Sequence, residues 1–219
     1  AVKDAECYLG APSETTAQDN FANGTFDVLC DTEAQAIDTV RQIVSLLPSN
    51  NLAPLPVFDF SESGAAPSAG MPVLDTITAA ADAGSVIELK AGFAENKVVT
   101  ALATVMGSTV GFVGEALCPC ACEKAAAFVR LCDAYSIPVV SLVDTQGFKK
   151  GETAEQKGIV KKATALACTY AGATTPKITL VTGQAVGAAY IALAGRGSNA
   201  DLAFAWNGAV LSALAVSYT

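Results

Sequence analysis

Two short stretches of the sequence hold residues whose types and spacing suggest chemistry: "GQAVGAAYIAL" at 183–193 and "DTQGFKKGE" at 144–152. The first contains no acid and no base, and the whole chain contains no histidine. A catalytic role for this stretch must therefore come from the backbone. A helix that begins near Val186 leaves several amide N–H groups without an acceptor inside the helix. These amides, at the positive end of the helix dipole, can stabilise a developing oxyanion.

A second amide from the 144–152 stretch, near Gly147 and Phe148, would complete a pair of donors. Such a pair suits reactions that pass through an enolate, because the catalyst then stabilises O⁻ and supplies no nucleophile. In the alternative interpretation, the small residues of 183–193 only allow a helix to pack closely on a sheet. The residues alone favour neither interpretation.

Both stretches follow uncharged segments, "VVSLVD" and "KITLVT", that are typical of strands covered on both faces. In layered α/β folds, sites form where such strands end and helices begin. Further strands are expected at 85–93, 97–107, 109–114 and 202–206, and helices at 73–84, 122–135 and 153–172. This β-β-α order, repeated along the chain, predicts an α/β fold.

The first part of the chain is expected to hold a helix over 32–47, capped by Thr32 or Asp31. Its apolar stripe, at helical spacing, consists of Ile37, Val40, Val44 and Leu47. The following stretch, 53–72, contains four prolines together with glycine, serine and acidic residues, which is typical of a linker. We therefore expect a boundary there, with one unit at 1–52 and a second at 73–219.

Composition limits the classes of function. The net charge of −8 argues against a nucleic-acid-binding protein, which normally has a basic face. Hydrophobic residues are 52% and charged residues 16%, so much of the chain should be buried in a core or between subunits. The uncharged stretches 178–195 and 202–219 are at the short limit for a membrane span and are interrupted by polar residues. We expect a cytoplasmic protein that does not insert into a membrane.

Three of the seven cysteines form a C-x-C-x-C cluster, Cys118, Cys120 and Cys122. Zinc sites usually need two separated ligand pairs, often with histidine, and this chain has neither. We therefore expect reduced thiols, with no metal and no disulfide.

The ordered motifs resemble a known family, the carboxyltransferase subunits of biotin-dependent acyl-CoA carboxylases and decarboxylases, within the crotonase-like superfamily. The resemblance covers most of residues 5–214. The motifs that carry it are "RQIVSLLPSNN", "EKAAAFVRLCDAYSIP", "IPVVSLVDTQGFKKGETAEQKG", "TTPKITLVTGQAVGAAYIAL" and "FAWNGAVLSAL". It implies a crotonase-like ββα superhelix, in which 73–219 is the second, biotin-side domain and 1–52 is the C-terminal part of the first.

The resemblance also implies roles for residues. The amides of Phe148 and Ala188 would face the ureido oxygen of biotin, with Gly187 and Ala189 beside them. The remaining implied binding residues are Asp144, Gly147 and Gly151, which would shape the first loop, and Ile191, which replaces an acid linked to acyl preference in the family.

The implied reaction moves a carboxylate between carboxybiotin and the α-carbon of an acyl-CoA. The implied partners are a biotin carrier protein, biotin carboxylase or decarboxylase subunits, and further copies of the chain in a trimer or a hexamer of dimers. The family's glycine-rich loop of the first domain and its C-terminal helices after "AWNGA" have no expected counterpart in this sequence, so either the sequence is a fragment or another chain supplies the missing half. Two alternatives remain open: an acyl-CoA hydratase, isomerase or hydrolase of the same fold, and a non-catalytic assembly module.

Overall fold

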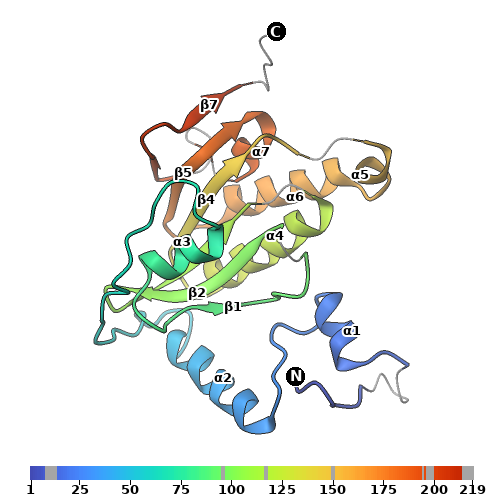
Figure 1. The fold of residues 1–219 in the computed structure, drawn as a ribbon, viewed down its shortest axis with the longest axis vertical. Helices are drawn as coiled ribbons and strands as arrows, with labels where there is room; N and C mark the ends of the chain where they lie inside the picture. Colours follow the sequence, from blue (N-terminus) through green and yellow to red (C-terminus); the bar gives the residue numbers. More distant parts are fainter. Residues whose placement is uncertain are drawn as a thin grey trace.

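The strands of the described residues form one mixed, seven-stranded sheet in the order β1-β2-β3-β4-β5-β6, with β7 also pairing with β5 (Figure 1). The structure is a computed structural model that describes residues 1–7, 14–94, 97–115, 118–148, 151–193, 195 and 200–213. The strands are β1 Ile87–Glu88, β2 Val99–Val105, β3 Ser108–Gly114, β4 Val139–Thr145, β5 Lys177–Val186, β6 Leu202–Ala205 and β7 Val210–Ser212. The helices are α1 Ala17–Ala22, α2 Glu33–Leu46, α3 Val73–Ala80, α4 Pro119–Ala134, α5 Glu152–Gln156, α6 Ile159–Gly172 and α7 Gly187–Ala192.

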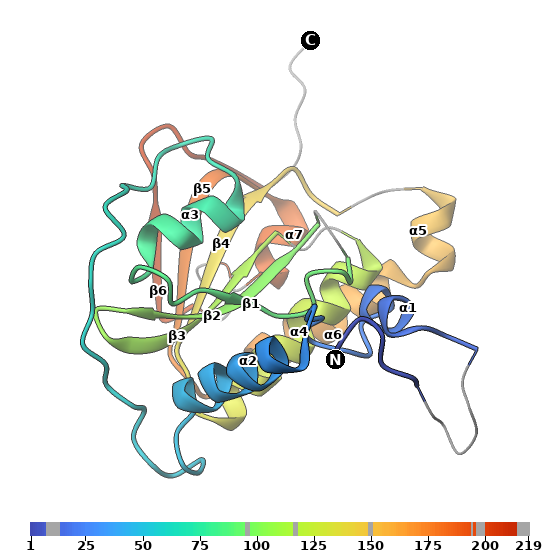
Figure 2. The same cartoon turned by 60° about the horizontal axis from the view of Figure 1, so that its bottom comes forward.

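The sheet is antiparallel from β1 to β3 and parallel from β3 to β6. Helices α2, α4 and α6 lie on one face, and α3 lies on the other (Figure 2). Two groups of buried side chains fill these layers, a large one under α4 and α6 and a smaller one around Ile77 of α3 and Phe112 of β3. Strands β2, β3 and β4 are therefore mostly buried between helical layers, as expected for an α/β fold, whereas β6 is largely exposed.

The expected helix at 32–47 is present as α2, and Thr32 caps it by accepting a hydrogen bond from the Gln35 N–H. Its orientation differs from what the spacing suggested. Leu46 is buried and Leu47 packs against the core, whereas Ile37, Val40 and Val44 are 53%, 59% and 61% exposed. These three side chains form an apolar face that this chain leaves uncovered.

Several expected elements are shorter than the sequence pattern suggested, and in two of them the break coincides with left-handed backbone. The helix expected at 153–172 is divided into α5 and α6 by Gly158, whose φ of 73° cannot continue a right-handed helix. The strand expected at 85–93 is reduced to Ile87–Glu88, and Lys90 beyond it has a φ of 55°. The short elements α1 and β7 were not predicted.

The proline-rich stretch 53–72 is fixed to the rest of the molecule at several points. The Phe58 N–H donates to the Gly107 carbonyl over 2.9 Å, and the Ser63 hydroxyl donates to the Ala79 carbonyl over 2.7 Å. On the other side of this stretch, the buried Thr109 hydroxyl donates to the Leu46 carbonyl over 2.9 Å and joins α2 to β3. The position of the domain boundary stays a prediction.

Helix α6 is held to the sheet by a buried hydroxyl pair, which gives a first prediction. The Tyr170 and Ser141 hydroxyl oxygens are 2.8 Å apart, and both residues are almost completely buried. Tyr170→Phe should lower the free energy of unfolding by about 1–3 kcal/mol, because the Ser141 hydroxyl loses its partner away from water. Urea unfolding followed by circular dichroism measures the change. The double variant Tyr170→Phe/Ser141→Ala should recover part of the loss, and a Tyr170→Phe variant of unchanged stability would contradict this account.

Candidate functional site

The two stretches singled out in the sequence meet at one cavity of about 710 Å³. Strands β4 and β5 are parallel neighbours, so both chains leave the sheet at the same edge, where Thr145 pairs with Ala185. The turn after β4 contributes Gln146, Gly147 and Phe148 to the wall, and the start of α7 contributes Val186, Gly187, Ala188 and Ala189. Helices α5 and α6 and the chain after β7 complete it with Glu155, Gly158, Ile159, Val160, Ala163 and Ala213.

The geometry leaves two amides available at this cavity. Ala188 is exposed and is the second residue of α7, where backbone N–H groups have no acceptor inside the helix. Neither the Phe148 nor the Ala188 N–H donates to another residue in the described parts of the chain. The Gly147 N–H is different, because it donates to the Thr145 hydroxyl over 3.1 Å. The arrangement thus offers the Phe148 and Ala188 amides, from two different elements, to a ligand oxygen.

Asp144 contributes to this edge of the sheet through a hydrogen bond and does not line the cavity. Its Oδ1 accepts from the Gln184 N–H over 2.8 Å, which joins the ends of β4 and β5 where the register shifts. Gly183 makes room for this contact, since a Cβ there would lie 2.4 Å from Cγ of Asp144. Asp144 therefore positions the two turns relative to each other.

The other predicted binding residues lie around the cavity. Gly147 and Gly151 both have a φ of 117°, a backbone conformation that favours glycine. Gly151 is outside the cavity wall and begins α5, where its carbonyl accepts from the Ala154 and Glu155 amides. Ile191 faces a separate, adjoining cavity of about 370 Å³, whose wall it shares with Ala188 and Leu211.

Carboxylates near the site are few. Of the described residues that line the 710 Å³ cavity, Glu155 is the one titratable side chain. Sequence reasoning missed Glu115, which directly follows β3 and has a φ of 52°. Burial, and next the charge of Asp144, raise the pKa of Glu115 above its usual range. The sequence signal was an acid directly after the uncharged run "TVGFVG".

The cysteine cluster lies at the start of α4. The Cys118 and Cys120 sulfur atoms are 2.8 Å apart as free thiols, and burial raises the pKa of Cys122 to about 12. Within the described residues, no group of three or more potential ligands is arranged to hold a metal. The expectation that these thiols bind no metal stays a prediction.

The mixed sheet between helices, with a cavity at the β4–β5 edge, defines a class of layered α/β proteins. Comparison with known proteins identifies the family to which this chain belongs. Residues 11–217 match the family model of the carboxyl transferase domain, and the chain belongs to that family. The motifs quoted from the sequence had predicted this family, and the prediction is confirmed. Within the parts of the chain that the structure describes, no helix has the length and apolar character needed to cross a bilayer.

Two curated relatives show which proteins of this family the chain is similar to. The chain is 32% identical over 206 residues to the methylmalonyl-CoA decarboxylase subunit alpha of Propionigenium modestum, covering 85% of this chain and 40% of the relative. It is also 32% identical over 221 residues to the biotin-dependent acetyl-/propionyl-coenzyme A carboxylase beta5 subunit of Mycobacterium leprae, covering 89% of this chain and 40% of the relative. This chain thus spans about two fifths of the length of these curated relatives.

A solved structure of the transcarboxylase 12S subunit, with hydrolysed methylmalonyl-coenzyme A bound, matches the fold with a TM-score of 0.88. The two chains are 28% identical, and the match covers 97% of this chain and 49% of the other. The expected crotonase-like carboxyltransferase fold is therefore confirmed.

The contact between Gly183 and Asp144 gives a second prediction. Gly183→Ala would push the Asp144 carboxylate away from the Gln184 N–H and should lower the free energy of unfolding by about 1 kcal/mol, the typical net contribution of a hydrogen bond. Asp144→Ala should have a similar effect, and the two changes together should cost little more than either alone, because both remove the same contact. Denaturant unfolding of the four proteins measures this coupling.

Gly172→Ala is the matched control, since a Cβ at Gly172 would meet no atom within 4 Å. Fully additive losses for Gly183→Ala and Asp144→Ala would show that the two residues act independently and that the proposed contact is not what they contribute.

Proposed function

We propose that this chain is the biotin-side domain of an acyl-CoA carboxyltransferase, which moves a carboxylate between carboxybiotin and the α-carbon of an acyl-CoA. The observation that carries the proposal is the cavity at which the Phe148 and Ala188 amides are both available. The family assignment and the names of the relatives support it.

The cavity suits the neutral bicyclic ring of biotin. Its wall is mostly apolar, with Phe148, Ile159 and Val186 among its members, and its small residues allow a ring to approach the backbone. Carboxybiotin supplies the carboxylate, and its ureido oxygen gains negative charge as the carboxylate leaves. The two amides would stabilise that charge, because donors fixed in a partly water-excluded site need no reorganisation during the reaction.

The remaining predicted residues are proposed to position this pair of donors. Gly187 and Ala189 flank Ala188, and their small side chains leave room for a ring to approach its amide. Gly147 provides the turn that presents the Phe148 amide. Asp144 joins the start of that turn to β5, and Gly151 begins α5 after it. Ile191 is proposed to contact the acyl group from the adjoining cavity, so an apolar acyl chain is favoured over a charged one there.

The acyl-CoA thioester is proposed to bind mainly to a part of the assembly outside residues 1–219, since these residues span about two fifths of the relatives' length. The proposed partners are a biotin carrier protein, biotin carboxylase or decarboxylase subunits and further copies of this chain, in a trimer or a hexamer of dimers in the cytoplasm. The exposed apolar face of α2, made by Ile37, Val40 and Val44, supports assembly, because such patches commonly mark interaction sites.

One observation favours a second candidate function. Glu155 is a carboxylate on the cavity wall, and an acyl-CoA hydratase or isomerase of the same fold would need such an acid–base group. Glu155→Gln separates the two functions. It should leave carboxyl transfer largely intact if the amides carry the reaction, and it should abolish a reaction that depends on proton transfer by Glu155.

Substitution of Ala188 tests the amide donor directly. Ala188→Pro removes one N–H at the cavity and should lower turnover by about 10²–10³, the usual loss for one oxyanion donor. Proline is tolerated in the first turn of a helix, and the preceding Gly187 has a φ of 58°, outside the right-handed helical region that proline disfavours. The assay is carboxyl transfer from carboxybiotin to an acyl-CoA in the complete assembly.

Ala188→Gly keeps the amide and is the control, with most of the activity expected to remain. A folded, fully active Ala188→Pro variant would show that the Ala188 amide is not a catalytic donor and that the small residues of 187–189 serve packing.

Dependence on biotin can be tested without mutation. Avidin sequesters biotin, so an excess of avidin should abolish carboxyl transfer by the complete assembly, and avidin saturated beforehand with free biotin should not. The measurement is transfer of labelled carboxylate to the acyl-CoA. Transfer that continues unchanged in the presence of avidin would rule out biotin as the carrier.

A further inference from the structure

The first turn of α4 holds two thiols in contact. Cys118 is the N-cap residue of the helix, and its Sγ accepts a hydrogen bond from the Ala121 N–H over 3.4 Å. This cap folds the Cys118 side chain over the first turn, where Cys120 is the second helical residue. The two sulfur atoms are 2.8 Å apart, and both residues are free thiols. The proposed carboxyltransferase reaction does not use this pair.

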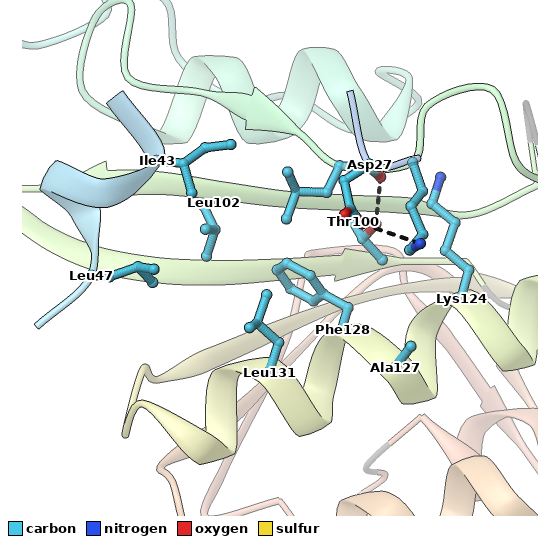
Figure 3. A pocket seen from close by; sticks show the side chains of 11 residues that line it. Asp27, Ile43, Leu47, Thr100, Leu102, Lys124, Ala127, Phe128 and Leu131 are labelled. Carbon is cyan, nitrogen blue, oxygen red and sulfur yellow. Dashed lines mark hydrogen bonds and ion pairs between the residues drawn. The ribbon is translucent and has the colours of Figure 1, made fainter. Parts of the chain in front are cut away.

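The position of this turn is fixed by the part of α4 that follows it. Lys124, one turn after Cys120, has a completely buried side chain. Its Nζ donates to the Val98 carbonyl over 3.0 Å and lies 3.8 Å from a Glu88 carboxylate oxygen. Lys124 and Phe128 face a cavity of about 310 Å³ between α2, β2 and α4 (Figure 3). A helix start held in this way keeps its two sulfur atoms together.

The thiols of the cluster differ in their access to solvent. Cys120 is half-buried, Cys118 is 6% exposed, and Cys122 is completely buried. An oxidant in solution therefore reaches Cys120 first. Burial raises the pKa of the Cys120 thiol, the Cys118 sulfur acts in the same direction, and the charge of Lys97 opposes them. The reactive thiolate is thus the minor form at neutral pH, and oxidation of Cys120 should become faster as the pH rises.

We propose that Cys118 and Cys120 form a dithiol site that a hydroperoxide closes to a reversible disulfide. The Cys120 thiolate attacks a peroxide oxygen, so that an S–O bond forms, the O–O bond breaks, and the leaving oxygen takes a proton from solvent. The Cys118 sulfur then attacks the Cys120 sulfenic acid, so that the S–S bond forms, the S–O bond breaks, and the hydroxyl leaves as water with the Cys118 proton. The two thiols lose two electrons, and the peroxide gains them.

The contact between the sulfur atoms favours this outcome over further oxidation. An approach of about 0.8 Å brings them from 2.8 Å to the S–S bond length of about 2.05 Å. The second step is intramolecular and pre-oriented, so Cys118 should react before a second peroxide carries Cys120 to the irreversible sulfinic acid. The inference does not depend on the proposed carboxyltransferase function.

The test treats the purified protein with hydrogen peroxide, alkylates it with N-ethylmaleimide in denaturant, and analyses its peptides by mass spectrometry. The peptide that contains Cys118, Cys120 and Cys122 should lose two hydrogen atoms and take up one maleimide instead of three. Dithiothreitol, added before alkylation, should restore all three sites. Cys168→Ser, which removes an exposed thiol on α6, is the control and should close the disulfide like the unaltered protein.

Two further variants separate the roles of the thiols. Cys118→Ser removes the thiol that resolves the sulfenic acid and keeps a side chain able to cap the helix, so dimedone should label Cys120 in this variant and not in the unaltered protein. Cys120→Ser should abolish both the disulfide and the label. Circular dichroism checks that both variants are folded.

Three results would overturn the proposal. The first is full alkylation of Cys118 and Cys120 after peroxide treatment. The second is a disulfide that joins Cys122 or two chains in place of this pair. The third is dimedone labelling of Cys120 that is equal with and without the Cys118 thiol.

Discussion

The parallel pairing of β4 with β5 is the constraint on which the rest of the structure depends. The pairing runs from Val139 with Lys177 to Thr145 with Ala185, so both chains leave the sheet at one edge. The completely buried Val143 and Val181 hold the strands between helical layers, and burial of such side chains contributes roughly 1.5–3 kcal/mol each. The Phe148 and Ala188 amides consequently share a cavity although they are distant in sequence.

Much of the layering could be predicted because it rests on local signals. Uncharged strand-length segments gave β4 and β5, and the cap at Thr32 gave the start of α2. What could not be predicted depends on tertiary context. The orientation of α2 is set by Leu46 and Leu47 packing on the core, and hydrophobic spacing alone does not separate them from the exposed Val40 and Val44. The left-handed backbone at Lys90 likewise has no signal in its residue type.

The candidate site likewise has one part that local sequence signals predict and another that depends on tertiary context. The meeting of the two stretches followed from the rule that sites form at strand ends, and the structure brings them together. The use of the Gly147 amide by Thr145, and the separation of Ile191 into an adjoining cavity, depend on turn geometry that sequence spacing does not encode. The cavity around Lys124 could not be predicted from sequence either, because its wall combines side chains from α2, β2 and α4.

The scarcity of titratable groups at the β4–β5 cavity has a consequence for how such a site responds to its surroundings. Backbone amides neither gain nor lose protons in the range that proteins tolerate, and Glu155 is the one ionisable side chain among the described residues of the wall. The Phe148 and Ala188 N–H donors therefore stay the same between acid and alkaline solution. A bell-shaped dependence of rate on acidity would therefore report ionisable side chains, the substrate or a partner, and not the two backbone donors.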